Sequence, residues 1–97
     1  MPDPFVHFKV MVKERASDLI LREGERPAIR VEGKIRFLTD DRFTAEEAEA
    51  LLSAILSPEE IGAFRVVMEK DVAFVVPGTG RFRANLFMQR KRTGFVF

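Results

Sequence analysis

The segment from Gly80 to Arg92, GRFRANLFMQRKR, constrains the fold most because its apolar and polar side chains alternate. Side chains along a β-strand point to opposite faces with a period of two, so the pattern predicts one strand with an apolar and a polar face. The predicted inward side chains are Phe82, Ala84, Leu86 and Met88, and the predicted outward ones are Arg81, Arg83, Asn85, Phe87 and Gln89. We expect this outer face to meet another protein surface or a phosphate group.

The charge of the chain is unevenly distributed. Residues 81–92 contain five basic side chains, and no acidic residue lies between Gly80 and Phe97. Because the whole chain carries a net charge of +1, residues 1–79 carry −4. This asymmetry predicts an anionic partner, or an acidic surface, for the C-terminal section. A basic hairpin that is only solvated is the alternative interpretation.

The length and composition indicate one domain, residues 1–97. The absence of cysteine excludes a disulfide framework and a thiolate metal site. No segment has the pattern of a signal peptide or the ~20 apolar residues of a membrane span. We therefore expect cytoplasmic localisation and no membrane insertion. Because the chain stops at Phe97 inside an apolar run, we also expect a fragment of a longer protein.

The first half of the chain is expected to form a helix and three strands. Apolar spacing predicts a helix over residues 5–15, and alternation predicts a strand over residues 17–22 with Leu19 and Leu21 inward. Two further strands, residues 28–32 and 34–38, are expected to pivot on the acid-glycine pair Glu32-Gly33. The inward side chains predicted for these two strands are Ile29, Val31, Ile35 and Phe37.

The second half is expected to form two helices and three strands. Thr44 and Ser57 are each followed three residues later by glutamate, which is the spacing of a capping box. The first helix is expected to run to about Leu56, and the second to residue 68 or 69. Strands over residues 71–76, 81–89 and 93–97 follow. The resulting fold class is α+β, with helices on one face of a mainly antiparallel sheet of about six strands.

Two blocks of the sequence resemble the N-terminal domain of the type IV pilus retraction ATPases, the PilT and PilU motor proteins. The first block, MVKERASDL (residues 11–19), resembles the end of the family's first helix, and a proline-led strand and a Val-Glu-Gly hairpin follow it. The second block, PGTGRFRANLFMQR (residues 77–90), resembles the family's proline-glycine turn, its Arg-Phe-Arg-Val-Asn strand and its Phe-x-Gln-Arg ending. The resemblance spans nearly the whole chain in unbroken order.

The resemblance implies a PAS-like fold and a role within a larger motor. It implies that this domain packs against the RecA-like ATPase domain of a neighbouring subunit in a homo-hexamer, and that the motor acts indirectly on the pilus inner-membrane platform. It also implies ATP and Mg²⁺ in the full-length protein and none in this chain. Arg83 matches the family arginine best placed to contact the nucleotide phosphates in trans, and Arg81 and Arg90 are weaker matches.

The other interface candidates are Asp18, Ile20, Asn85, Phe87 and Arg92. Two positions depart from the family pattern, because Ile20 replaces a histidine or an aromatic residue and Ala84 replaces valine. For Asp18, a structural hydrogen bond at the start of its strand is the simplest role. For Arg83, the alternative to phosphate contact is a salt bridge across the sheet or at a domain interface.

No catalytic constellation is recognisable in this chain, which alone is not expected to be an enzyme. The phosphate-binding Gly-x-x-x-x-Gly-Lys-Ser/Thr motif is absent, and Gly78-Thr79-Gly80 is interpreted as a hairpin turn. His7 is the sole histidine, so a metal site is not expected. The glutamates of the two capping boxes complement helix dipoles, which explains them without acid–base catalysis.

Two other functions are compatible with the sequence. A free-standing PAS-like sensor would use some of the ten phenylalanines to line a ligand pocket. A nucleic-acid-binding module would use Arg81, Arg83, Phe87 and Arg90–Arg92 to hold phosphate and to stack a base. Nucleic acid is the least favoured partner, because only one aromatic residue lies on the predicted basic face.

Overall fold

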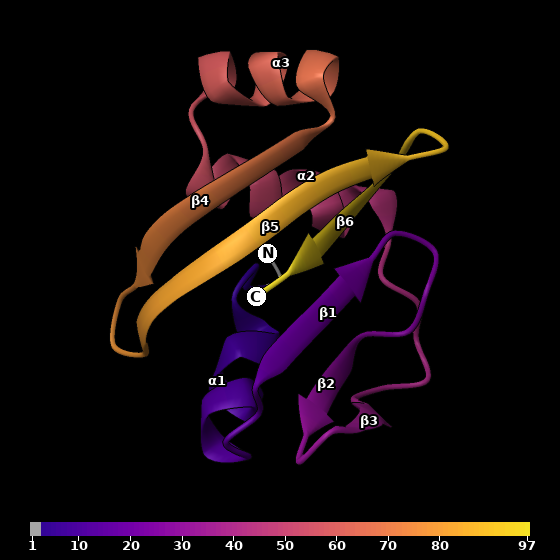
Figure 1. Cartoon of the computed structure of the whole chain (residues 1–97), viewed down its shortest axis with the longest axis vertical. Helices are drawn as coiled ribbons and strands as arrows, with labels where there is room; N and C mark the ends of the chain where they lie inside the picture. Colours follow the sequence, from indigo (N-terminus) through magenta and orange to yellow (C-terminus); the bar gives the residue numbers. More distant parts are fainter. Residues whose placement is uncertain (1–2) are drawn as a thin grey trace.

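In the computed structural model, which describes residues 3–97, the chain forms one six-stranded antiparallel sheet and three helices within that range (Figure 1). The helices are α1 (Val6–Lys13), α2 (Ala45–Ile55) and α3 (Pro58–Val67). The strands are β1 (Asp18–Arg22), β2 (Ala28–Val31), β3 (Lys34–Phe37), β4 (Glu69–Val76), β5 (Gly80–Gln89) and β6 (Arg92–Val96). Their types and order match the prediction, which confirms the α+β class.

The last strand lies in the middle of the sheet. The strand order is β3-β2-β1-β6-β5-β4, so β6 separates the N-terminal strands from the C-terminal hairpin. It pairs antiparallel with β1, where Ile20 faces Val96, and antiparallel with β5, where Leu86 faces Phe95. Figure 1 shows β6 between these two neighbours, with α2 behind β5 and β6. The domain therefore depends on contacts between residues that are far apart in sequence.

The core lies between one face of the sheet and the helices. Its fully or nearly fully buried side chains come from the sheet (Leu19, Leu21, Ile29, Leu86, Phe95) and from the helices (Phe8, Leu51, Leu52, Phe64). The ring of Phe8 contacts those of Phe97 and Phe82 edge-on, with centroid distances of 4.6 and 4.8 Å. Such edge-to-face contacts are favourable geometries for aromatic pairs. Mutual packing therefore accounts for these phenylalanines without a ligand.

The alternation predicted for residues 81–89 is confirmed. Ala84 and Leu86 are buried on the helix-covered side, whereas Arg81 and Arg83 are exposed on the opposite side. The hairpin of β4 and β5 is paired continuously from Glu69–Phe87 to Val76–Gly80. Both strands therefore contribute side chains to the face of the sheet opposite the helices.

Both predicted capping boxes are present. The Thr44 hydroxyl accepts from the Glu47 N–H at 3.1 Å, and the Glu47 carboxylate accepts from the Thr44 N–H at 3.0 Å. Ser57 and Glu60 form the same reciprocal pair at the start of α3. Among residues 3–97, no helix is long and apolar enough to cross a bilayer.

The predicted orientation of β3 is wrong. A two-residue turn at Glu32-Gly33 pairs Val31 with Lys34 and Ile29 with Arg36. Directly paired residues share a face, so Arg36 lies on the side of buried Ile29, where it forms an ion pair with Glu14 at 2.7 Å. Ile35 and Phe37 consequently point to the opposite face and are 45% and 55% exposed. The apolar pattern led to the prediction that Ile35 and Phe37 are buried, but β3 is an edge strand and these two side chains lie outside the core.

Gly94 in β6 is required by a close ring contact. Gly94 faces Phe87 across the β5–β6 ladder, and a Cβ at this position would lie 2.3 Å from the Phe87 ring. The ring therefore covers the glycine backbone, an arrangement known to stabilise glycine in sheets. Gly62 in α3 is the opposite case, because an added Cβ there would have no neighbour within 4 Å.

We therefore expect the two glycines to respond to alanine with opposite signs. Gly94→Ala forces the Phe87 ring to move and should lower the free energy of unfolding by about 1–3 kcal/mol. Gly62→Ala removes backbone entropy from the unfolded chain and should raise it by about 0.5–1 kcal/mol. Urea denaturation of the two variants measures both effects. In a Phe87→Ala background, Gly94→Ala should cost much less, and an equal loss there would contradict the ring contact.

His7 generates a pH dependence of stability. It is half-buried on α1, and this burial lowers its pKa below the usual 6.5, although the negative charge of Glu47 acts in the opposite direction. The unfolded chain therefore binds a proton at a higher pH than the folded domain does. The contribution of neutral His7 to stability is complete above the pKa that this side chain has in the unfolded chain. It is lost as the pH falls through 6.5 toward the lowered pKa of His7 in the folded domain.

We therefore expect the urea midpoint of the wild-type chain to decrease as the pH is lowered from about 7.5 to about 5.5. In His7→Gln, which cannot titrate, this fall should be smaller. The interval avoids the carboxylates, including Glu60, whose pKa is lowered by hydrogen bonds from Ser57. The same slope in both chains would rule out His7 as its source.

Candidate functional site

The face of the sheet opposite the helices carries most of the predicted site residues, and we call it the open face. Its outward-pointing residues include Asp18, Ile20, Arg22, Arg30, Ile35, Phe37, Asp71, Val75, Arg81, Arg83, Asn85, Phe87, Arg92 and Val96. Arginines, aromatic rings and aliphatic side chains alternate across it. Exposed apolar side chains beside arginines are typical of protein–protein interfaces.

Arg81 and Arg83 extend from β5 beside small or apolar neighbours. Across the ladder, Arg81 faces Val75 and Arg83 faces Ala73. Both arginines are exposed, and neither takes part in an ion pair within residues 3–97. The intramolecular salt bridge considered for Arg83 is therefore absent from this part of the chain. Its guanidinium is free to engage an anion outside the domain.

Asn85 and Asp18 are held by neighbours on the open face. The Asn85 amide donates to the Asp71 carboxylate at 3.0 Å, directly across the β4–β5 ladder. The Asp18 carboxylate accepts from Arg30 at 3.1 Å and from the Ser17 hydroxyl at 3.0 Å. This agrees with the structural hydrogen bond expected for Asp18. Both polar side chains are thus positioned by the sheet itself.

Arg90 lies in the two-residue turn between β5 and β6, and most of β5 separates it from Arg83. Gln89 pairs with Arg92, which leaves Arg90 and Lys91 at the tip. Six residues at about 3.3 Å each place Arg83 roughly 20 Å from this end of the strand. The structure therefore brings Arg81 and Arg83 together at one end of β5 and Arg90 and Arg92 together at the other. A single phosphate group cannot contact both pairs.

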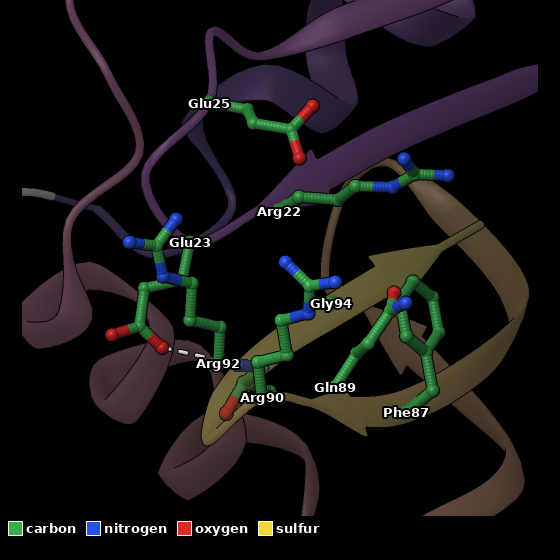
Figure 2. Close-up of a pocket in the computed structure, with 9 residues that line it drawn as sticks. Arg22, Glu23, Glu25, Phe87, Gln89, Arg90, Arg92 and Gly94 are labelled. Carbon is green, nitrogen blue, oxygen red and sulfur yellow. Dashed lines mark hydrogen bonds between the residues drawn. The ribbon is translucent and has the colours of Figure 1, made fainter.

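A hollow with a volume of about 380 Å³ opens beside this turn, and we call it the turn groove. Its lining residues include Arg22, Phe87, Gln89, Arg90, Arg92 and Gly94. Figure 2 shows the side chains of Arg90 and Arg92 extending from the turn toward the segment that carries Arg22 and Glu25. The Arg22 guanidinium lies 5.9 Å from the centre of the Phe87 ring, within the range of a cation–π contact.

A second hollow of about 290 Å³ lies on the open face toward the β3 edge. Its apolar lining consists of Ile20, Ala28, Ile35 and Phe37. The Arg26 guanidinium covers the Phe37 ring at 4.2 Å and donates to Asp40 at 3.1 Å. This hollow can accept an apolar side chain from a partner. Ile20 lines it, which places this predicted interface residue beside exposed apolar surface.

Sequence reasoning missed Arg22, Glu23, Ile35 and Phe37 as parts of the site. Arg22 belongs to the strand predicted over residues 17–22, but its position beside Phe87 depends on the long-range pairing of β1 with β6. Ile35 and Phe37 could have been found from the two-residue turn at Glu32-Gly33, which fixes their face.

The described side chains of the open face offer groups for binding. Within residues 3–97, no three histidine, cysteine, aspartate or glutamate side chains are grouped to hold a metal ion. The open face instead offers unpaired guanidinium groups that can hold anions, and exposed apolar side chains that can be buried by a partner.

No protein-family model matches the chain. The chain is 38% identical over 85 residues to the type IV pilus retraction ATPase PilT of Pseudomonas aeruginosa, and this match covers 88% of the chain and 25% of PilT. It is 27% identical over 88 residues to the type IV pilus ATPase PilU of the same organism, with coverage of 91% and 23%. The chain thus spans about a quarter of the length of these relatives.

Solved structures show the same fold. The pilus retraction motor PilT with bound ADP superposes with a TM-score of 0.82 at 33% identity, covering 99% of this chain and 28% of that one. The Legionella pneumophila ATPase DotB superposes with a TM-score of 0.80 at 20% identity, covering 99% and 30%, and therefore supports the fold alone. Together, sequence and fold show that the chain is similar to the N-terminal domain of the PilT and PilU type of pilus ATPase.

Proposed function

We propose that this chain is the N-terminal interaction and regulatory domain of a hexameric type IV pilus retraction motor, located in the cytoplasm. In this proposal, the open face docks on the ATPase domain of a neighbouring subunit. The full-length protein binds ATP and Mg²⁺ and hydrolyses ATP, while this domain transmits the resulting movement toward the pilus platform in the inner membrane. The relatives PilT and PilU support the proposal, because both are pilus ATPases.

The observation that carries this proposal is that the open face exposes both apolar side chains and arginines without ion-pair partners. Ile35, Phe37 and Val75 are between 45% and 60% exposed on it. Arg81 and Arg83 lie on the same face without ion-pair partners in residues 3–97. Aromatic and arginine side chains frequently dominate the binding energy of interfaces. A partner that buries this face would satisfy both the apolar surface and the charges.

Arg83 is proposed to contact the nucleotide phosphates in trans, with Arg81 beside it. A guanidinium offers a planar fork of donors that matches a terminal phosphate. Because β5 is rigidly paired with β4 and β6, the orientation of the whole domain would decide whether Arg83 reaches the neighbouring subunit's nucleotide. Arg90 is left out of this contact by its distance along the strand.

We therefore expect Arg83→Ala in the complete protein to slow ATP hydrolysis by at least about tenfold, because arginines supplied to a transferring phosphate contribute about 10³–10⁵-fold elsewhere. Steady-state turnover of the purified hexamer measures this. Arg65→Gln is the matched control, since Arg65 lies on α3 in an ion pair with Glu49, away from the open face. Arg83→Ala in the isolated domain should leave the urea midpoint unchanged. Normal turnover of the Arg83 variant would remove the trans contact from the proposal.

Docking itself has a separate test. Phe37→Ser should weaken assembly of the hexamer, because it removes an exposed ring from the open face without emptying the core. Val66→Ser on α3, where the side chain is 80% exposed, is the control for loss of exposed apolar surface elsewhere. Sedimentation velocity of the complete protein reports the oligomer. Equal assembly in both variants would contradict docking through this part of the open face.

A further inference from the structure

The turn groove gathers three arginines that remain without carboxylate partners. Arg22, Arg90 and Arg92 line it from β1, from the turn and from β6. None of the three forms an ion pair within residues 3–97, whereas the nearby Arg26 and Arg30 do. Arg92 is accommodated by Gly24, where a Cβ would lie 3.1 Å from its guanidinium nitrogen. A concentration of unpaired positive charge in a hollow is the electrostatic pattern of an anion site.

The backbone at the tip of the turn is held in an unfavourable conformation. Arg90 and Lys91 have φ angles of 53° and 64°, in the left-handed region. Two-residue hairpin turns of this kind favour Asn-Gly or Gly-Gly, because in the left-handed region the Cβ of most residues lies too close to the following carbonyl oxygen. Each such residue makes the folded backbone less stable. The chain thus keeps two basic side chains at positions where stability alone would favour asparagine and glycine.

The size of the turn groove and its acidic rim favour a small anion over an acidic protein surface. Its volume of about 380 Å³ falls within the usual range for small-molecule sites, about 300–1,000 Å³. Glu23 and Glu25 also line it, and Glu23 accepts a hydrogen bond from the Thr93 N–H at 3.0 Å. These carboxylates would repel an extended acidic surface. They can instead accept from hydroxyl or amino groups that a small ligand carries next to its phosphate.

We propose that the turn groove binds a nucleoside phosphate, at a site separate from the contact proposed for Arg83. Arg90 and Arg92 hold the phosphate group, since guanidinium groups engage phosphate oxygens in pairs. The ring of the ligand lies against Phe87 beside the Arg22 guanidinium, where aromatic and cationic stacking are both available. Glu25 at the rim accepts from the sugar hydroxyls or from an exocyclic amine.

The first test is a titration of the 97-residue chain, followed by backbone amide NMR, with GMP, AMP and inorganic phosphate as separate probes. We expect shifts confined to residues 22–25 and 87–94 with all three probes, and at least tenfold tighter binding of one nucleotide than of inorganic phosphate. Absence of shifts, or shifts centred on Arg81 and Arg83, would overturn the proposal. Equal affinity for inorganic phosphate and both nucleotides would overturn the nucleoside part. Stronger shifts from a glutamate-rich peptide would replace the proposal with an acidic protein partner.

Matched variants separate a binding role from a structural one. Arg92→Gln should weaken nucleotide binding about tenfold, as expected for one lost charge-assisted hydrogen bond. Arg65→Gln, on α3 and outside the lining of the groove, should leave it unchanged. The double change Arg90→Asn with Lys91→Gly should weaken binding yet raise the urea midpoint, because it relieves the strained turn. Weaker binding in Arg65→Gln, or unchanged binding in Arg92→Gln, would contradict the assignment of the groove.

The proposed site in the turn groove and the proposed trans contact of Arg83 can be disproved independently of each other. Loss of nucleotide binding to the isolated domain in Arg92→Gln concerns only the turn groove, whereas turnover of the hexamer in Arg83→Ala concerns only the interface.

Discussion

The pairing of β6 between β1 and β5 is the constraint on which the rest of the structure depends. Phe97 and Leu19 exchange backbone hydrogen bonds at 2.9 and 3.1 Å. These bonds help to join the N-terminal strands of the sheet to its C-terminal strands. The same segment delivers Phe95 and Phe97 to the core, where Phe97 contacts Phe8 of α1. Without this strand, the β1–β2–β3 meander and the β4–β5 hairpin would be two separate units, each with an uncovered apolar face.

The central strand also creates both parts of the candidate site. Gly94 of β6 lies between Arg22 of β1 and Phe87 of β5, so a residue without a side chain lets the ring and the guanidinium approach each other. Val96 similarly separates Ile20 from Asn85. Residues distant in sequence thus become neighbours on the open face. The arrangement of residues on the open face follows from the same long-range pairing that holds the core.

Local signals in the sequence were sufficient for the elements and for β5. Capping at Thr44 and Ser57 and the alternation of Arg81–Gln89 depend on neighbours within a few residues, so they could be predicted without the fold. Ile35 and Phe37 were misplaced, because on an edge strand apolar side chains need not face the core. The turn groove could not be predicted at all, since the strand order that brings Arg22 beside Phe87 is not encoded in a local pattern.

The two ends of β5 differ in a way that suggests two separate binding tasks. Arg81 and Arg83 project from a regular ladder, beside Val75 and Ala73, onto a broad surface suited to a protein partner. Arg90 and Lys91 occupy a turn whose conformation disfavours them, next to a hollow that a small ligand can fill. Backbone strain persists where function opposes its removal. Because β5 connects both ends rigidly, a ligand in the groove and a neighbouring subunit at Arg83 would act on the same strand. Coupling between them would then require only a change in the orientation of the domain.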